Sequence, residues 1–274
     1  MRIKSVEELQ SHPEYKEALV DLLYQLADDD LIVSFRGSEW LGLCPHIEED
    51  VAYSSITQNT MGHAAMYYQL LEDIGEGDAD FLAHAREREQ RKNAIVLEEA
   101  NGTGTYLEEP RFDWAFTVVR NYFYDVAKKI RLESLMNSSY EPLANVASKV
   151  LGEQYYHVMH WEVWFKQLLS STEEARRRMS EQVERVWEDF GGVLTLGPNG
   201  QKMVQFGLIE DEEVLANRWI EKIAATLKEL GLSLPSERPQ MKQGDGRAGV
   251  HTADLDVALV VIAEVYNSDR TAAW

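Results

Sequence analysis

The sequence predicts an all-α protein built on a bundle of four long helices, with additional helices in its C-terminal part. Apolar residues recur at intervals of three and four over long segments. The 7 Pro and 17 Gly residues of the 274-residue chain gather mostly at a few places between these segments. No alternation of apolar and polar residues is long enough to predict a β-strand.

The core bundle is expected at about residues 13–170. After Pro13, apolar residues such as Leu19, Leu22 and Leu26 follow helical spacing, and a turn containing Pro45 ends this segment. The expected long helices cover about residues 15–40, 47–74, 112–136 and 143–169. Between the second and the third, we expect a short charged helix at 79–92 and a loop at 93–111 that crosses the body.

The C-terminal part, residues 171–274, is expected to be a helical extension of the same domain, so that the chain forms one domain over residues 1–274. Thr172, followed by Glu173 and Glu174, caps a fifth helix that ends near Phe190. Further helices are expected at about 211–230 and 252–267, separated by a Gly- and Pro-rich loop at 231–250. Two antiparallel helix pairs joined by a crossover are the outline of a ferritin-like four-helix bundle.

Composition excludes several classes of partner and of site. With 27 Lys and Arg against 47 Asp and Glu, the net charge is −20, which repels nucleic acids and anionic membrane surfaces. The N-terminus lacks the apolar segment of a signal peptide, and the longest apolar run, Val257–Ala263, is too short to cross a bilayer. The single cysteine, Cys44, excludes an internal disulfide. We therefore expect a soluble cytoplasmic protein.

Polar residues interrupt the apolar stripe of each long helix near its middle. They are Asp29 and Asp30, Thr60 and His63, Asp125, and Gln154 and His157. His63 lies as far after the turn at Pro45 as Ala27 lies before it. In the other helix pair, His157 lies as far after the connecting turn as a position beside Asp125 lies before that turn. Because residues equally far from a turn lie side by side in an antiparallel pair, these polar residues are expected to form one layer.

A layer of carboxylates and histidines is where ferritin-like proteins hold two metal ions, with a Glu-x-x-His pair on each of two helices. Residues three apart share a helix face, so both reach the same metal pair. Here Thr60 and Gln154 stand three positions before His63 and His157. Since these neutral side chains are poor ligands for a hard cation, we expect a degenerate layer with no bound metal, no cofactor and no catalytic residue.

Three interpretations of the layer remain open. The residues form a hydrogen-bonded polar layer that sets the register of the bundle. Alternatively, His63, His157, Asp125 and one of Asp29 and Asp30 retain a mononuclear or atypical dinuclear metal site, with Glu153, one position from Gln154, as an additional ligand. In the third interpretation the helix register differs from the one assumed here.

One further cluster is basic. Arg86, Arg88, Arg91 and Lys92 follow one another in an otherwise acidic chain. The simplest interpretation is a solvated face, and docking of an anionic ligand or partner is the alternative.

Several stretches, in their order and spacing, carry a resemblance to a known family. They are Leu26-Ala-Asp-Asp-Asp-Leu-Ile, Ser38-Glu-Trp, Glu48-Glu-Asp, Met61-Gly-His-Ala, Gly75-Glu-Gly-Asp, Glu153-Gln-Tyr-Tyr-His157, Gly-Val-His251-Thr and the terminal Trp274. In these the chain resembles the C-type, structural subunits of bacterial phenylacetyl-CoA epoxidase, a multicomponent oxygenase of aerobic phenylacetate degradation. His63 departs from the pattern, since other members are expected to carry Gln there.

The resemblance implies a ferritin-like fold and a stable complex with a homologous catalytic A-type subunit, which carries the di-iron centre. It also implies a CoA-thioester substrate, a separate reductase and other oxygenase components acting mainly at other subunits. The chain itself is then expected to be a non-catalytic scaffold, with Trp161 and Trp164 as candidates for an exposed partner face. The alternative function is a metal-dependent oxygenase, di-iron or mononuclear, in its own right.

Overall fold

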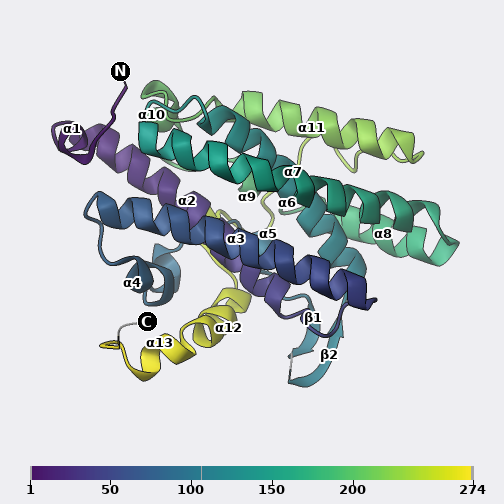
Figure 1. The fold of residues 1–274 in the computed structure, drawn as a ribbon. Helices are drawn as coiled ribbons and strands as arrows, with labels where there is room; N and C mark the ends of the chain where they lie inside the picture. Colours follow the sequence, from purple (N-terminus) through teal and green to yellow (C-terminus); the bar gives the residue numbers. More distant parts are fainter. Residues whose placement is uncertain (1, 106, 273–274) are drawn as a thin grey trace.

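The computed structural model describes residues 2–105 and 107–272, and its long helices lie lengthwise against one another (Figure 1). The four longest are α2 (Pro13–Ser38), α3 (Ile47–Asp73), α6 (Trp114–Leu135) and α7 (Glu141–Ser170). Helix α2 packs against α3, α6 packs against α7, and α3 also contacts α7. The prediction of an all-α, ferritin-like bundle is confirmed, with helix bounds within a few residues of those expected.

Local sequence explains where these helices begin. Pro13 stands at the first position of α2 and Pro142 in the first turn of α7, where a missing N–H costs no hydrogen bond. The Asp113 side chain accepts hydrogen bonds from the backbone N–H groups of Ala115 and Phe116 and so caps α6.

The crossover between α3 and α6 differs from the expectation. The helix expected at 79–92 is only α4 (Ala79–His84), followed by the 3-10 turn η1 (Arg88–Gln90). The loop expected at 93–111 contains α5 (Ile95–Glu98) and a hairpin of β1 (Gly102–Thr105) and β2 (Glu108–Phe112), so the expectation of no strands was wrong here. These strands are too short and too exposed to show a period of two.

The remaining helices surround the bundle. They are α1 (Val6–Gln10), α8 (Glu173–Trp187), α9 (Gly191–Leu194), α10 (Gly200–Gln205), α11 (Glu212–Glu229), η2 (Gly246–Ala248), α12 (Ala253–Ile262) and α13 (Glu264–Ser268). Helices α8 and α11 pack on α6, while α12 contacts α2 and α5 and leads to α13 at the edge of the molecule (Figure 1). The short helices α1, α9 and α10 were not expected. Trp274 lies outside the described residues.

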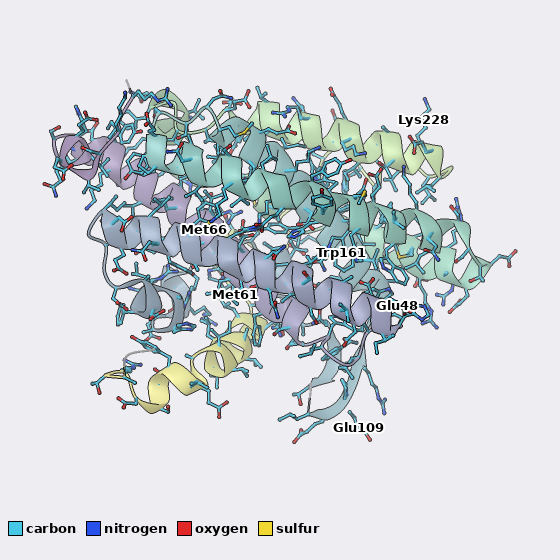
Figure 2. The ribbon with its side chains drawn as sticks, viewed as in Figure 1. Glu48, Met61, Met66, Glu109, Trp161 and Lys228 are labelled. Atoms are coloured by element: carbon cyan, nitrogen blue, oxygen red, sulfur yellow. The ribbon has the colours of Figure 1, made fainter. Side chains whose placement is uncertain are left out.

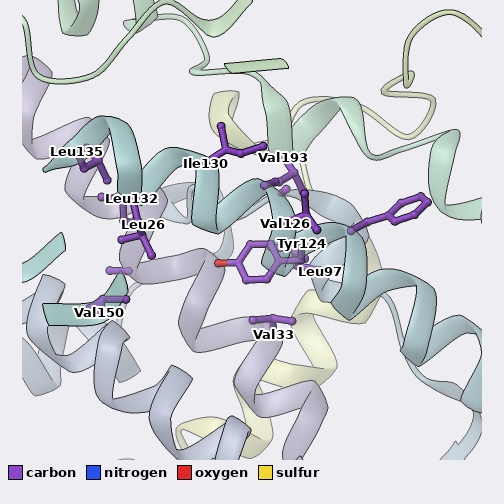
Figure 3. Close-up of a cluster of buried hydrophobic side chains, with 14 of the residues drawn as sticks. Leu26, Val33, Leu97, Tyr124, Val126, Ile130, Leu132, Leu135, Val150 and Val193 are labelled. Atoms are coloured by element: carbon purple, nitrogen blue, oxygen red, sulfur yellow. The ribbon is translucent and has the colours of Figure 1, made fainter. Parts of the chain in front are cut away.

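The apolar core joins the bundle to the elements around it. Figure 3 shows Leu26 and Val33 of α2, Val150 of α7 and Val193 of α9 gathered around side chains of α6. The core continues from α1 to α11. Within the described part of the chain, every helix is too short or too polar to span a lipid bilayer.

Candidate functional site

Lys128 of α6 lies at the centre of the polar layer. Its buried ammonium group donates to Asp30 Oδ1 at 2.7 Å and lies 3.0 Å from His63 Nδ1. The Tyr124 hydroxyl also donates to Asp30 Oδ1, at 2.7 Å. Because an ammonium group only donates, His63 Nδ1 accepts and its Nε2 carries the proton, which points to Glu153 Oε2 at 2.9 Å. One chain of hydrogen bonds therefore connects all four long helices.

Asp29 does not join this chain, although the sequence placed it in the same layer. Its carboxylate accepts two hydrogen bonds from Arg247, at 2.8 and 2.7 Å, and one from the Ala94 backbone N–H at 2.8 Å. The Arg131 guanidinium lies 3.5 Å away. Asp29 thus ties the crossover and the 231–250 loop to α2, because Arg247 belongs to η2 in that loop.

Gln154 and Thr60, the residues that the sequence predicts at the ligand positions, both form hydrogen bonds within the bundle. Gln154 Nε2 donates to Asp125 Oδ1 at 2.8 Å, and burial raises the pKa of Asp125 to about 7. The Thr60 hydroxyl donates to the Ile56 carbonyl of its own helix at 2.9 Å. Both side chains donate hydrogen bonds to neighbouring oxygen atoms, and neither carries a negative charge.

His157 is the least satisfied member of the layer. Its ring is buried and centred 6.0 Å from that of His63, and neither of its nitrogens has a hydrogen-bond partner among the described residues. Burial, with Lys128 adding to it, lowers the pKa of His63 to about 2 and that of His157 to about 3. Both histidines are therefore neutral at pH 7.

A pair of metal ions does not fit these residues. The Lys128 ammonium already supplies a positive charge between Asp30 and His63, and it would repel a cation bound there. Asp29 is neutralised by Arg247. Across residues 2–105 and 107–272, no three or more His, Cys, Asp and Glu side chains are grouped so as to hold a metal ion.

Lys128 was not among the residues predicted for the layer, although the sequence carries a signal for it. Lys128 follows Asp125 by three positions and therefore shares its helix face. A lysine on a helix face is usually exposed, so its place in the sequence does not by itself predict a buried ammonium group. Arg247 had no such local signal.

The basic cluster in the crossover is not a solvated face, so that interpretation was wrong. Arg86 and Arg91 are buried and both pair with the buried Asp28 of α2. Burial alone would raise the pKa of Asp28, but the two guanidinium groups outweigh it and lower the pKa. Arg88 and Lys92 are partly exposed, and Arg88 pairs with Asp256 of α12. The cluster holds the crossover against the bundle.

The interpretation of Trp161 and Trp164 as exposed aromatics was also wrong. Trp161 is fully buried, with its ring 4.8 Å from that of Tyr53. Trp164 is half-buried, and its indole N–H donates to Glu49 Oε2 at 2.6 Å. His160 lies 3.0 Å from Glu49 Oε1. These rings hold α7 against α3.

Comparison with known proteins identifies the family of this chain. The model of the family PaaA_PaaC, described as phenylacetic acid catabolic protein, matches residues 3–274. The chain is also 27% identical over 232 residues to the C subunit of 1,2-phenylacetyl-CoA epoxidase from Escherichia coli (strain K12). That similarity covers 84% of this chain and 89% of the relative. Because the family match extends over nearly its whole length, the chain belongs to the phenylacetic acid catabolic protein family.

Proposed function

We propose that this protein is the non-catalytic structural subunit of a phenylacetyl-CoA epoxidase-type oxygenase and that it stabilises a di-iron catalytic subunit in aerobic phenylacetate catabolism. The observation that carries the proposal is the Lys128 ammonium group between Asp30 and His63. The positive charge of Lys128 occupies the middle of the bundle, where oxygen-activating relatives need the positive charge of metal ions. The layer then contributes rigidity and register to the fold.

The name of the bacterial relative supports a role within a complex. A protein named as the C subunit of 1,2-phenylacetyl-CoA epoxidase has other subunits as partners. In the proposed complex, the iron belongs to the homologous A-type subunit, and this chain supplies a rigid helical surface to it. Obligate interfaces of this kind bury about 2,000 Å² or more, and their subunits are often unstable alone.

One observation favours the rival function, a metal-dependent oxygenase in its own right. His157 has two unpartnered ring nitrogens in the described structure and lies beside His63. Two neutral imidazoles close together suit iron or manganese. The carboxylates around them, however, are already engaged: Asp30 binds Lys128, Asp125 binds Gln154, and Glu153 accepts the His63 Nε2 proton.

Two measurements on one preparation test the proposal. The chain is co-expressed with the catalytic A-type subunit, and the purified complex and the separate chain are analysed for iron and manganese. We expect a stoichiometric complex, with metal in the complex and far less than one equivalent in this chain alone. Near-stoichiometric metal in the chain, abolished by His63→Ala or His157→Ala, would establish the rival function. Two proteins that elute separately at micromolar concentration would refute the structural role.

A further inference from the structure

Helix α3 has an exposed side without charge. Between Val51 and Leu71 it contains no Asp, Glu, Lys or Arg, although 27% of the chain is charged. At ~1.5 Å per residue, this stretch is about 30 Å long. Burial does not explain the absence of charge, because one side of the stretch is open to solvent. Its exposed residues are Val51, Ser55, Gln58, Met61, Ala65 and Gln69.

The neighbouring helix α7 continues this surface. Tyr155 and Tyr156 are 57% and 64% exposed, and Met159 and Val163 follow at helical spacing with 48% and 57% exposed. Figure 2 shows α3 and α7 side by side, with Met61 and Met66 labelled along α3. Tyrosine and methionine are enriched at the buried centre of protein interfaces, and Glu153, a charged residue within this part of α7, is paired with His63. We call this surface the α3/α7 face.

Two glycines indicate what kind of element the α3/α7 face accepts. Gly62 and Gly152 stand inside α3 and α7, where glycine destabilises a helix relative to alanine. A Cβ atom at either position would meet no atom within 4 Å, so internal packing does not require glycine. The two lie at the same level, because the adjacent His63 and Glu153 are hydrogen-bonded across the two helices. Small residues at one level allow a third helix to approach closely.

We propose that the α3/α7 face is the docking surface for helices of a different subunit, namely the catalytic A-type subunit of the proposed complex; the inference rests on that proposed function. Two helices, each about 10 Å wide and 30 Å long, present roughly 600 Å² in projection, close to the ~800 Å² that each partner buries in a standard interface. A second copy of this chain is a poorer occupant, because each copy carries a net charge of −20.

A second exposed apolar stripe provides the matched control. Val257, Val260 and Val261 of α12 are exposed, Val260 by 73%. This helix is short, carries Asp254 and Asp256 in its first turn, and packs against α2, α5 and η1 at the edge of the molecule (Figure 1). A carboxylate introduced at Val260 has the same chemistry as one introduced at Val163, on a different surface.

The test compares Val163→Asp, Gly152→Leu and Val260→Asp with the unmodified chain in binding to the purified A-type subunit. Circular dichroism and the thermal midpoint show whether each variant is folded. We expect Val163→Asp and Gly152→Leu to raise the Kd at least tenfold, because the first places a charge on the part of the face near the start of α3 and the second places a bulky side chain at its centre. Val260→Asp should leave the Kd unchanged.

The outcomes separate the two proposals. If the unmodified chain does not bind the A-type subunit, the proposed function fails. If the unmodified chain binds and both α7 variants bind as tightly as it does, the α3/α7 face is not the docking surface. Loss of binding only in Val260→Asp would assign the docking surface to α12. Sedimentation of the chain alone tests the remaining occupant. A dimer that Val163→Asp dissociates would mean that the face binds a second copy.

Discussion

Replacing Lys128 with methionine tests whether its ammonium group holds the polar layer together. Methionine has a similar length and no charge, so the cavity stays filled while the ion pair is lost. Asp30 then keeps only the hydrogen bond from Tyr124, and His63 Nδ1 loses its donor.

The magnitude follows from the geometry of the pair. At 2.7 Å between Lys128 Nζ and Asp30 Oδ1, the Coulomb attraction is about 6 kcal/mol for an effective dielectric constant of about 20. Desolvation of both groups offsets part of this attraction. Removing one partner of a buried pair costs about 3–5 kcal/mol, because the other charge stays buried and uncompensated. We expect Lys128→Met to lower the free energy of unfolding by that amount.

Urea unfolding at pH 7, followed by tryptophan fluorescence and circular dichroism, measures the change. Lys129→Met is the matched control: this lysine is the next residue of α6, partly exposed, and lies 3.8 Å from Glu133. It should cost less than about 0.5 kcal/mol. The double variant Asp30→Asn/Lys128→Met should be more stable than the sum of the single losses predicts, by at least about 2 kcal/mol. Equal, small losses at Lys128 and Lys129 would refute the reasoning.

Three further predictions concern the same interior. Burial lowers the pKa of His63 to about 2 and that of His157 to about 3, so between pH 6.5 and those values only the unfolded chain protonates the two histidines. Each histidine should therefore lower the free energy of unfolding by about 2 kcal/mol when the pH falls from 7 to 5. In urea titrations at the two pH values, His157→Gln should abolish the contribution of His157 to this loss. Asp125 acts in the opposite sense: its pKa is raised to about 7, so its protonated form stabilises the fold below that pH and the contribution is lost as the pH rises through 7. Asp125→Asn should therefore lose about 2 kcal/mol more on acidification from pH 7 to pH 5 than the unmodified chain, and an equal loss would contradict the assignment. Arg247→Met should cost about 3 kcal/mol by leaving Asp29 with only the Arg131 charge, and an unchanged thermal midpoint would show that the 231–250 loop is not tied to the bundle through this pair.

The positions of the long helices are a property of the sequence itself. Periodic apolar residues and a few local signals, such as Pro13 and the cap at Asp113, determine where α2 and α6 begin. The same information predicts that Thr60 and Gln154 stand at the positions where ferritin-like bundles carry metal ligands. The hairpin and the short helices carry too few residues for any period to emerge.

Only the tertiary structure decided what each buried charge binds. Successive helix residues point about 100° apart, so Asp28, Asp29 and Asp30 face three different surroundings. Their partners Arg86, Arg247 and Lys128 stand 58, 218 and 98 positions further along the chain. No local pattern spans such separations, because these pairs form only after the crossover and the C-terminal loop have packed against α2. The sequence alone therefore predicts that two metal ligands are absent, and the packed structure places the buried Lys128 ammonium group between Asp30 and His63.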